Sequence, residues 1–119
     1  MESKEKVTFS RYGKSFQEQL CMVILDDRPF ADQIEEVLDI NFLELRYLKL
    51  FTKVIFQYRQ KYGVHPSRQI LGTILRSGID DENELTQQQV REYYARVMAA
   101  VLENHEFIKD TALDFCRKQ

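Results

Sequence analysis

Hydrophobic side chains recur at the three- and four-residue spacing of helices in four successive segments of residues 15–78. The first segment opens at Ser15, whose hydroxyl can cap free backbone amides while Glu18, three residues later, reaches back in a capping box. It is expected to end at Asp26 and Asp27, because carboxylates at the end of a helix oppose its dipole. Its apolar face consists of Phe16, Leu20, Val23 and Ile24.

The second and third segments predict a short helix followed by a long one. Pro29 suits the first turn of the short helix. The long helix is expected over residues 45–62, with Gly63 as its C-cap. Its apolar arc is so wide that it should pack against several neighbours, which predicts a central position. The apolar residues are Phe30, Ile34, Val37 and Leu38 in the short helix, and Tyr47, Leu48, Leu50, Phe51, Val54, Ile55, Phe56, Tyr58 and Tyr62 in the long one.

Three further helices are expected after the long one. Ser67 can cap a helix that stops at Gly78. An acidic loop then leads to a helix that opens at Thr86, with Gln89 three residues on. A polar break near residues 103–105 precedes the last helix. The apolar positions of the three helices are Ile70, Leu71, Ile74 and Leu75, then Val90, Tyr93, Tyr94, Val97 and Val101, and finally Phe107, Ile108, Ala112, Leu113, Phe115 and Cys116.

The periodicity therefore predicts an all-α protein. Alternation of apolar and polar residues never persists beyond a few positions, so no strand is expected. We expect one domain over residues 14–119, with a compact helical head over 14–85 and a helical hairpin over 86–119. Residues 1–13 carry few apolar side chains and are interpreted as a flexible N-terminal arm.

Composition fits one small domain without disulfides. The chain has 119 residues, of which 44% are hydrophobic, enough for a single core. Its formal net charge of −2 argues against a dedicated nucleic-acid binder. Cys21 and Cys116 are expected as free buried thiols in a reducing compartment. No apolar run approaches about 18 residues and the first residues are too charged for a signal peptide, so a cytoplasmic protein is expected.

No set of residues is typical of a catalytic or metal site. Residues 13–15 (Gly-Lys-Ser) resemble the end of a phosphate-binding loop, but Thr8 stands where that loop needs a glycine, so a helix start is favoured. His65 and His105 have no second ligand at metal spacing. Adjacent acidic residues on a helix point about 100° apart and do not converge. The expectation is that the chain has no catalytic residue, no cofactor and no metal.

Two basic features raise the question of nucleic-acid binding. Arg46, Lys49 and Lys53 share a stripe of the long helix opposite its apolar arc, and this basic stripe can meet phosphate or an acidic partner. A solvated face is the favoured interpretation, since a wide apolar arc leaves charge no other place. The helix over residues 67–78 also resembles a recognition helix, but the acidic chain disfavours that interpretation.

The last two helices carry the strongest interaction signal. Tyr93 and Tyr94 are adjacent, so they cannot both point into one core, and the two apolar arcs leave more surface than a hairpin alone buries. An excess of aromatic and Met side chains is typical of self-association or partner docking. The alternative, that the first four helices cover these arcs, is equally compatible with the sequence.

The order of these features is similar to that in the N-terminal domain of DnaB-type replicative helicases, over residues 16–118. The opening helix, the turn that ends in a Phe, the apolar pairs of the long helix and the Tyr-Ala start of the hairpin follow in the family's order. Leu45 and Tyr47 stand where the family usually has Pro and His. The segments that carry the resemblance are residues 17–20, 23–27, 38–42, 50–51, 54–55, 64–75 and 94–97.

The resemblance implies a non-catalytic domain of a DNA-replication helicase whose ATPase lies in a separate domain. In that family the domain forms a collar by pairing hairpins, and it docks primase. The partners implied are further copies of the chain (a dimer or higher oligomer) and primase or a helicase loader, with DNA reached only through the full-length protein and no membrane. The alternative is a small stand-alone helical DNA-binding regulator. The association surface implied by position comprises Tyr93, Arg96, Val97, Val101, Phe107, Ile108 and Phe115.

Overall fold

The computed structural model describes residues 7–101, 103 and 105–119, and within these ranges the chain is all-α, with no strand. The elements are the 3-10 helix η1 (Ser10–Tyr12), α1 (Gly13–Asp26), α2 (Arg28–Ile34), the 3-10 helix η2 (Ile40–Phe42), α3 (Arg46–Tyr62), α4 (Arg68–Gly78), α5 (Glu84–Ala99) and α6 (Glu106–Arg117). Over the same residues no helix combines the length and the apolar character needed to cross a lipid bilayer.

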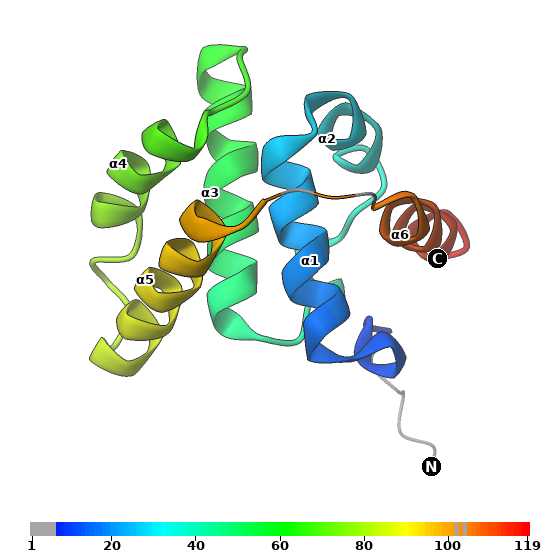
Figure 1. Cartoon of the computed structure of the whole chain (residues 1–119), viewed down its shortest axis with the longest axis horizontal. Helices are drawn as coiled ribbons and strands as arrows, with labels where there is room; N and C mark the ends of the chain where they lie inside the picture. Colours follow the sequence, from blue (N-terminus) through cyan, green and yellow to red (C-terminus); the bar gives the residue numbers. More distant parts are fainter. Residues whose placement is uncertain (1–6, 102, 104) are drawn as a thin grey trace.

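Two helices, α1 and α3, lie side by side at the centre of the molecule (Figure 1). α2 and α6 pack on α1 at one side, while α4 and α5 pack on α3 at the other. The wide arc of α3 explains its position, because it buries seven residues between Tyr47 and Ile55. Gly63 ends this helix in the left-handed region, at φ +72°, which a glycine adopts without strain. The central position and the C-cap were both predicted and are confirmed.

α5 and α6 do not form the hairpin predicted for residues 86–119. They lie on opposite sides of α1, with the connection between them crossing that helix (Figure 1). α5 packs on α3, whereas α6 packs on α1 and α2. Each helix finds its own aromatic partner: the Tyr93 ring lies 4.8 Å from the Phe51 ring, and the Phe115 ring lies 4.6 Å from the Phe9 ring. The two apolar stripes therefore pack on different parts of the core.

The N-terminal segment belongs to the fold from Phe9 onward, which corrects part of the flexible arm predicted for residues 1–13; residues 1–6 lie outside the described part of the chain. Phe9 is fully buried, and its N–H donates to the Phe42 carbonyl at 2.8 Å. Its ring lies at the centre of an aromatic cluster. The aromatic cluster consists of Phe9, Tyr12, Phe16, Phe42 and Phe115.

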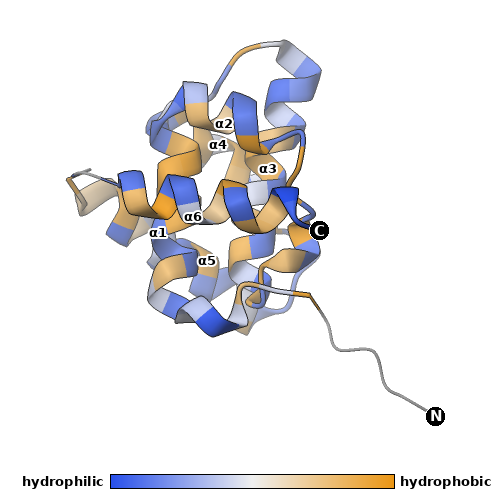
Figure 2. Cartoon of the chain, turned by 90° about the vertical axis from the view of Figure 1, so that its right-hand side faces the viewer, coloured by the Kyte–Doolittle hydropathy of each residue, from blue (hydrophilic) through white to orange (hydrophobic). Residues whose placement is uncertain are grey.

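α6 covers α1 with one face and shows the other to solvent. Hydrophilic and hydrophobic positions alternate around its ribbon when the molecule is viewed from the α6 side (Figure 2). One apolar residue departs from this pattern, since Phe107 is 71% exposed. The buried face consists of Ile108, Ala112, Leu113, Phe115 and Cys116.

The start of α1 lies slightly earlier than the sequence suggests. The helix begins at Gly13 and no side chain caps it, so the capping box expected from Ser15 and Glu18 does not form. Glu18 instead accepts a hydrogen bond at its Oε2 from Arg96 Nη2, at 2.6 Å. The carboxylate thereby ties α1 to α5.

Side-chain caps fix the starts of α4 and α5. The Ser67 hydroxyl accepts a hydrogen bond from the Ile70 N–H at 3.1 Å, as predicted for α4. Asn83, rather than Thr86, caps α5, because its side-chain oxygen accepts from the Thr86 N–H at 2.8 Å. Asparagine is as good a cap as serine or threonine, so the longer helix is the more stable choice.

Asp27 joins three helices. It follows α1, and its Oδ1 accepts from the Phe30 N–H at 3.0 Å to cap α2. Its Oδ2 accepts from Lys109 Nζ of α6, also at 3.0 Å. Burial acts to raise the pKa of this carboxyl, but the two hydrogen bonds and the ammonium charge outweigh burial and hold the pKa below its ordinary value.

Asp27→Asn is expected to destabilise the fold by about 1 kcal/mol or less at neutral pH, because asparagine still caps α2 but cannot pair with Lys109. The folded pKa of Asp27 lies below the unfolded value of about 3.9. Its charge therefore stabilises the fold above that pH, and this contribution is lost as the pH falls through the folded pKa. Urea unfolding gives the difference in free energy of unfolding between Asp27→Asn and the original chain. This difference should be smaller at about pH 2.5 than at about pH 7. An equal difference at both would contradict this account.

Arg59 of α3 holds α2 and the α3–α4 connection together. Its side chain is only 12% exposed and forms ion pairs with Glu35, at 3.1 Å, and with Asp32. The Arg59 Nη1 donates to His65 Nδ1 at 2.8 Å, and His65 Nε2 donates to the Leu25 carbonyl at 2.6 Å. A guanidinium only donates and a carbonyl only accepts, so these bonds select the Nε2–H tautomer of His65.

Candidate docking surface

α4 lies at the edge of the molecule, beside α3 and α5 (Figure 1). Among its eleven residues only Leu71 and Leu75 are buried. This narrow buried stripe leaves a groove on each side of the helix, one toward α3 and one toward α5. We call α4 together with its two grooves the α4 face.

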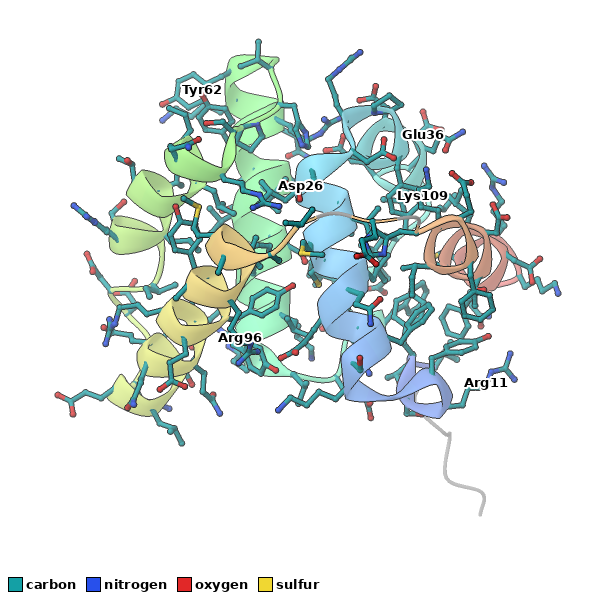
Figure 3. All side chains as sticks on the ribbon, in the orientation of Figure 1. Arg11, Asp26, Glu36, Tyr62, Arg96 and Lys109 are labelled. Carbon is teal, nitrogen blue, oxygen red and sulfur yellow. The ribbon has the colours of Figure 1, made fainter. Side chains whose placement is uncertain are left out.

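The α3–α4 groove has a volume of about 610 Å³ and an exposed apolar lining. Tyr62 and Ile70 line it and are 57% and 42% exposed. Tyr62 lies at the end of α3 next to α4 (Figure 3), with its ring 4.7 Å from that of Tyr58. Lys61 Nζ lies 5.4 Å from the centre of the Tyr62 ring. Large apolar side chains that gather on a surface in this way are typical of contact sites.

The α4–α5 groove has a volume of about 510 Å³ and a different make-up. Its floor is apolar and its rim is polar, which is the usual arrangement at the core and edge of a protein interface. Asp80 lies at the end of the groove nearest the α4–α5 loop. The floor consists of Leu75, Ile79, Val90 and Tyr94, and the rim of Gln69, Thr73, Arg76, Gln87 and Arg91.

Tyr94 and Gly72 set the shape of the α4–α5 groove. The Tyr94 hydroxyl donates to the Arg68 carbonyl at 2.8 Å, which fixes the ring across the start of α4. A Cβ at Gly72 would collide with the Tyr94 hydroxyl and with its Cζ. Arg68 is itself held by a bidentate pair with Asp26, at 2.9 and 2.6 Å, and donates to the Ala100 carbonyl at 3.0 Å. The groove is thus anchored to the end of α1 and to the end of α5.

Gly72→Ala is expected to destabilise the chain by about 1–3 kcal/mol. Inside a helix, alanine is more favourable than glycine by about 1 kcal/mol. Overpacking against the Tyr94 ring, however, costs about 1–3 kcal/mol, and loss of the hydrogen bond to Arg68 costs about 1 kcal/mol. Urea unfolding measures the change, with Ser77→Ala on the exposed side of α4 as the control, expected within about 0.5 kcal/mol. A Gly72→Ala protein at least as stable as the original would show that Tyr94 does not pack against this glycine.

The seven residues predicted as an association surface do not share one surface. Four of them are buried within the chain, at 2% to 8% exposure, because α1 and α3 and the aromatic cluster cover them. Val101 and Phe107 are 82% and 71% exposed; Val101 lies in the connection after α5, and Phe107 lies at the start of α6. Arg96 is exposed and pairs with Glu18. The four buried residues are Tyr93, Val97, Ile108 and Phe115.

The basic stripe of α3 is only partly free. Arg46 forms a two-armed pair with Glu82, with Nη2 to Oε2 at 2.7 Å and Nε to Oε1 at 3.1 Å. Lys49 is half-buried and Lys53 is exposed. One of the three cations therefore has a carboxylate of its own, and Arg68, at the start of the possible recognition helix, is committed to Asp26. The structure offers phosphate less free charge than the sequence suggests.

The groups considered for chemistry have structural surroundings. Burial raises the pKa of the Cys21 thiol to about 12, although a hydrogen bond from Thr52 acts in the other direction. Burial likewise raises the pKa of Cys116 to about 12. Thiols in such sites are poor nucleophiles at neutral pH. Across the described residues, no group of three or more His, Cys, Asp or Glu is arranged to hold a metal ion.

Sequence reasoning missed Gly72 and Arg68 as parts of the site. A glycine inside a helical pattern is a recognised sign of close packing, so Gly72 carried a signal in the sequence. No signal in the sequence indicated how Arg68 is held, because its partner Asp26 is 42 positions away in the chain. Comparisons of the chain with protein-family models, with curated proteins and with solved structures give no match.

Proposed function

We propose that this chain is a docking domain that recognises a protein partner through the α4 face. The observation that carries the proposal is the exposure of Tyr62 and Ile70 in one groove of a molecule whose central helices are well buried. Apolar side chains of this size are stabilised when a partner removes them from water. A partner that lies on α4 would cover both residues at once.

Recognition rather than catalysis fits the residues that line the two grooves. Their linings, within the described chain, include no histidine or cysteine, and Asp80 is the one carboxylate. Acid–base and nucleophilic chemistry require such groups within hydrogen-bond reach of one another. The docking role also needs no cofactor.

A narrower form of the proposal is the N-terminal interaction domain of a DnaB-type replicative helicase. It is supported by the order of sequence features over residues 16–118 and by the all-α fold. In this form the domain helps subunits to associate and docks primase or a helicase loader in the cytoplasm. Val101 and Phe107 are the apolar residues of the predicted association surface that remain exposed for contact between copies.

Titration of the purified chain with primase from the same source, by isothermal calorimetry, tests the proposal. Ile70→Asp is expected to weaken binding by roughly tenfold or more, because it places a charge in the α3–α4 groove that the partner would have to desolvate. Ile70 lies in the first turn of α4, where an acidic residue is favoured by the helix dipole. The fold should therefore survive the substitution.

Leu85→Asp is the matched control, since Leu85 is also an exposed apolar residue in the first turn of a helix. It should bind primase as the unaltered chain does. Sedimentation velocity of the Phe107→Asp variant tests whether copies of the chain associate through Phe107. Loss of primase binding in Phe107→Asp but not in Ile70→Asp would assign docking to the α5–α6 connection instead of the α4 face. A chain that is monomeric and binds neither primase nor loader would refute the helicase role.

A further inference from the structure

We infer that the α4–α5 groove binds an acidic, amphipathic helical segment of a partner protein. Its apolar side chains lie on the groove floor, and its carboxylates pair with Arg76 and Arg91. This inference rests on the proposed docking function and specifies the chemistry of the partner.

The floor of the groove is formed before any partner arrives. Leu75, Ile79 and Val90 are at most 5% exposed, so their positions are fixed by the core beneath them. Tyr94 is fixed by its hydrogen bond to the Arg68 carbonyl. A volume of about 510 Å³ exceeds what one apolar side chain fills. The floor therefore suits a row of apolar side chains at the three- and four-residue spacing of a helix.

The rim carries two arginines that have no carboxylate partner in the described chain. Neither Arg76 nor Arg91 forms an ion pair within the described chain, and Arg91 Nη1 donates to Gln87 Oε1 at 3.5 Å. Two guanidinium groups without carboxylates, on one groove, favour an anionic partner that can accept paired hydrogen bonds. By contrast, the arginines that pair with carboxylates of this chain, at 3.5 Å or less, are Arg28, Arg46, Arg59, Arg68 and Arg96.

The surroundings of the groove favour a peptide over nucleic acid. Asp80 lies at one end, and the exposed Asp81 and Glu84 follow in the next turn of the chain. A duplex lying along α4 would bring its continuous phosphates against these carboxylates. A short helix can place its few acidic residues at the arginines alone and turn neutral or basic residues toward Asp80.

The two grooves are continuous, which favours a helix over a small molecule. Thr73 lines both the α3–α4 and the α4–α5 groove, so the outer surface of α4 joins them. A helix laid along α4 can use the floor of one groove and contact Ile70 in the other. A small ligand in the α4–α5 groove would leave Tyr62 and Ile70 exposed.

Selection from a randomised phage-displayed library of peptides about 16 residues long, roughly four helical turns, tests the inference on the purified chain. Selected peptides are expected to be acidic, with apolar residues at three- and four-residue spacing. A fluorescein-labelled copy of the leading peptide then gives affinities by fluorescence anisotropy. Arg76→Glu with Arg91→Glu should weaken its binding by roughly tenfold or more. A copy with lysines in place of its acidic residues should regain affinity for that double variant.

Arg11→Glu with Arg117→Glu is the control, because it makes the same change in net charge at exposed positions away from the groove. Its affinity should stay within about twofold of the original, as expected for screened distant charges, and circular dichroism checks that both double variants are folded. Peptides without acidic bias, or full binding by the Arg76/Arg91 variant, would overturn the inference. Competition by a short DNA duplex that is lost in the same variant would also overturn it.

The proposed function and this inference can fail separately. If Ile70→Asp abolishes peptide binding while the Arg76/Arg91 reversal leaves it intact, docking takes place in the α3–α4 groove and only the inference fails. If neither change affects binding, the α4 face is not the docking surface and both fail.

Discussion

Phe9→Ala is expected to lower the free energy of unfolding by about 3–5 kcal/mol, the cost of removing a fully buried phenylalanine. Phe9 has no exposed surface, and its ring lies 4.6 Å from that of Phe115, 5.9 Å from Phe16 and 6.2 Å from Phe42. The substitution leaves a cavity at the centre of the aromatic cluster, where η1, η2, α1 and α6 meet. Urea unfolding followed by circular dichroism measures the change.

Val7→Ala is the matched control for this prediction. Val7 stands two residues before Phe9 but is 48% exposed, so its truncation should change stability by no more than about 0.5 kcal/mol. If Phe9→Ala were as mild as Val7→Ala, the segment would be the flexible arm that the sequence predicts.

Arg59→Ala is expected to cost about 3 kcal/mol, because removing one partner of a mostly buried ion pair leaves the other charge uncompensated. Glu35 is the carboxylate most affected, since its side chain is 24% exposed and its Oε2 already has no hydrogen-bond partner in the described structure. His65 also loses the donor to its Nδ1. Urea unfolding at neutral pH measures the difference in free energy of unfolding between Arg59→Ala and the original chain.

Two further variants separate the buried charge from other effects of losing Arg59. Arg28→Ala removes an arginine that is 66% exposed and 3.5 Å from Asp32, so it should cost less than about 1 kcal/mol. Adding Glu35→Gln to Arg59→Ala should restore part of the stability, because it removes the uncompensated carboxylate. No restoration, or equal costs for the two arginines, would show that the Glu35 charge is not what Arg59 balances.

Local signals account for the parts of the fold that were predictable. α3 ends at Gly63 and α4 begins after Ser67, and both boundaries depend on single residues that stabilise a helix end by their own chemistry. The wide apolar arc of α3 likewise indicated that several helices surround it. The second helix was predicted too long, since α2 stops at Ile34 and the next residues form a turn.

Partners between elements were not predictable from the periodicity. An apolar stripe says that one face of a helix is buried but not which element buries it, so the stripes of α5 and α6 were expected to face each other. Tyr93 packs on Phe51 of α3, and Phe115 packs on Phe9. A single Phe in a polar segment gives no periodic signal, and this is why Phe9 was expected in a flexible arm.

The candidate site was predictable only in part, for the same reason. Helical spacing marked Ile70 as apolar, but its exposure depends on how far α4 stands from α3. Gly72 was a readable sign of close packing, whereas the pairing of Arg68 with Asp26 arises only when distant segments meet. Arg68 is thereby committed to Asp26, whereas Arg76 and Arg91 line the groove without a carboxylate partner in the described chain.

The contact between Phe9 and Phe115 has a consequence for synthesis of the chain on the ribosome. Phe9 and Phe42 emerge early, but Phe115, whose ring packs on both, is translated only after α1 to α5 have been made. The nascent polypeptide must therefore carry these aromatic rings uncovered until α6 has been made, a condition that favours engagement by holding chaperones. A message cut short before the codon for Phe115 would leave those rings uncovered for good.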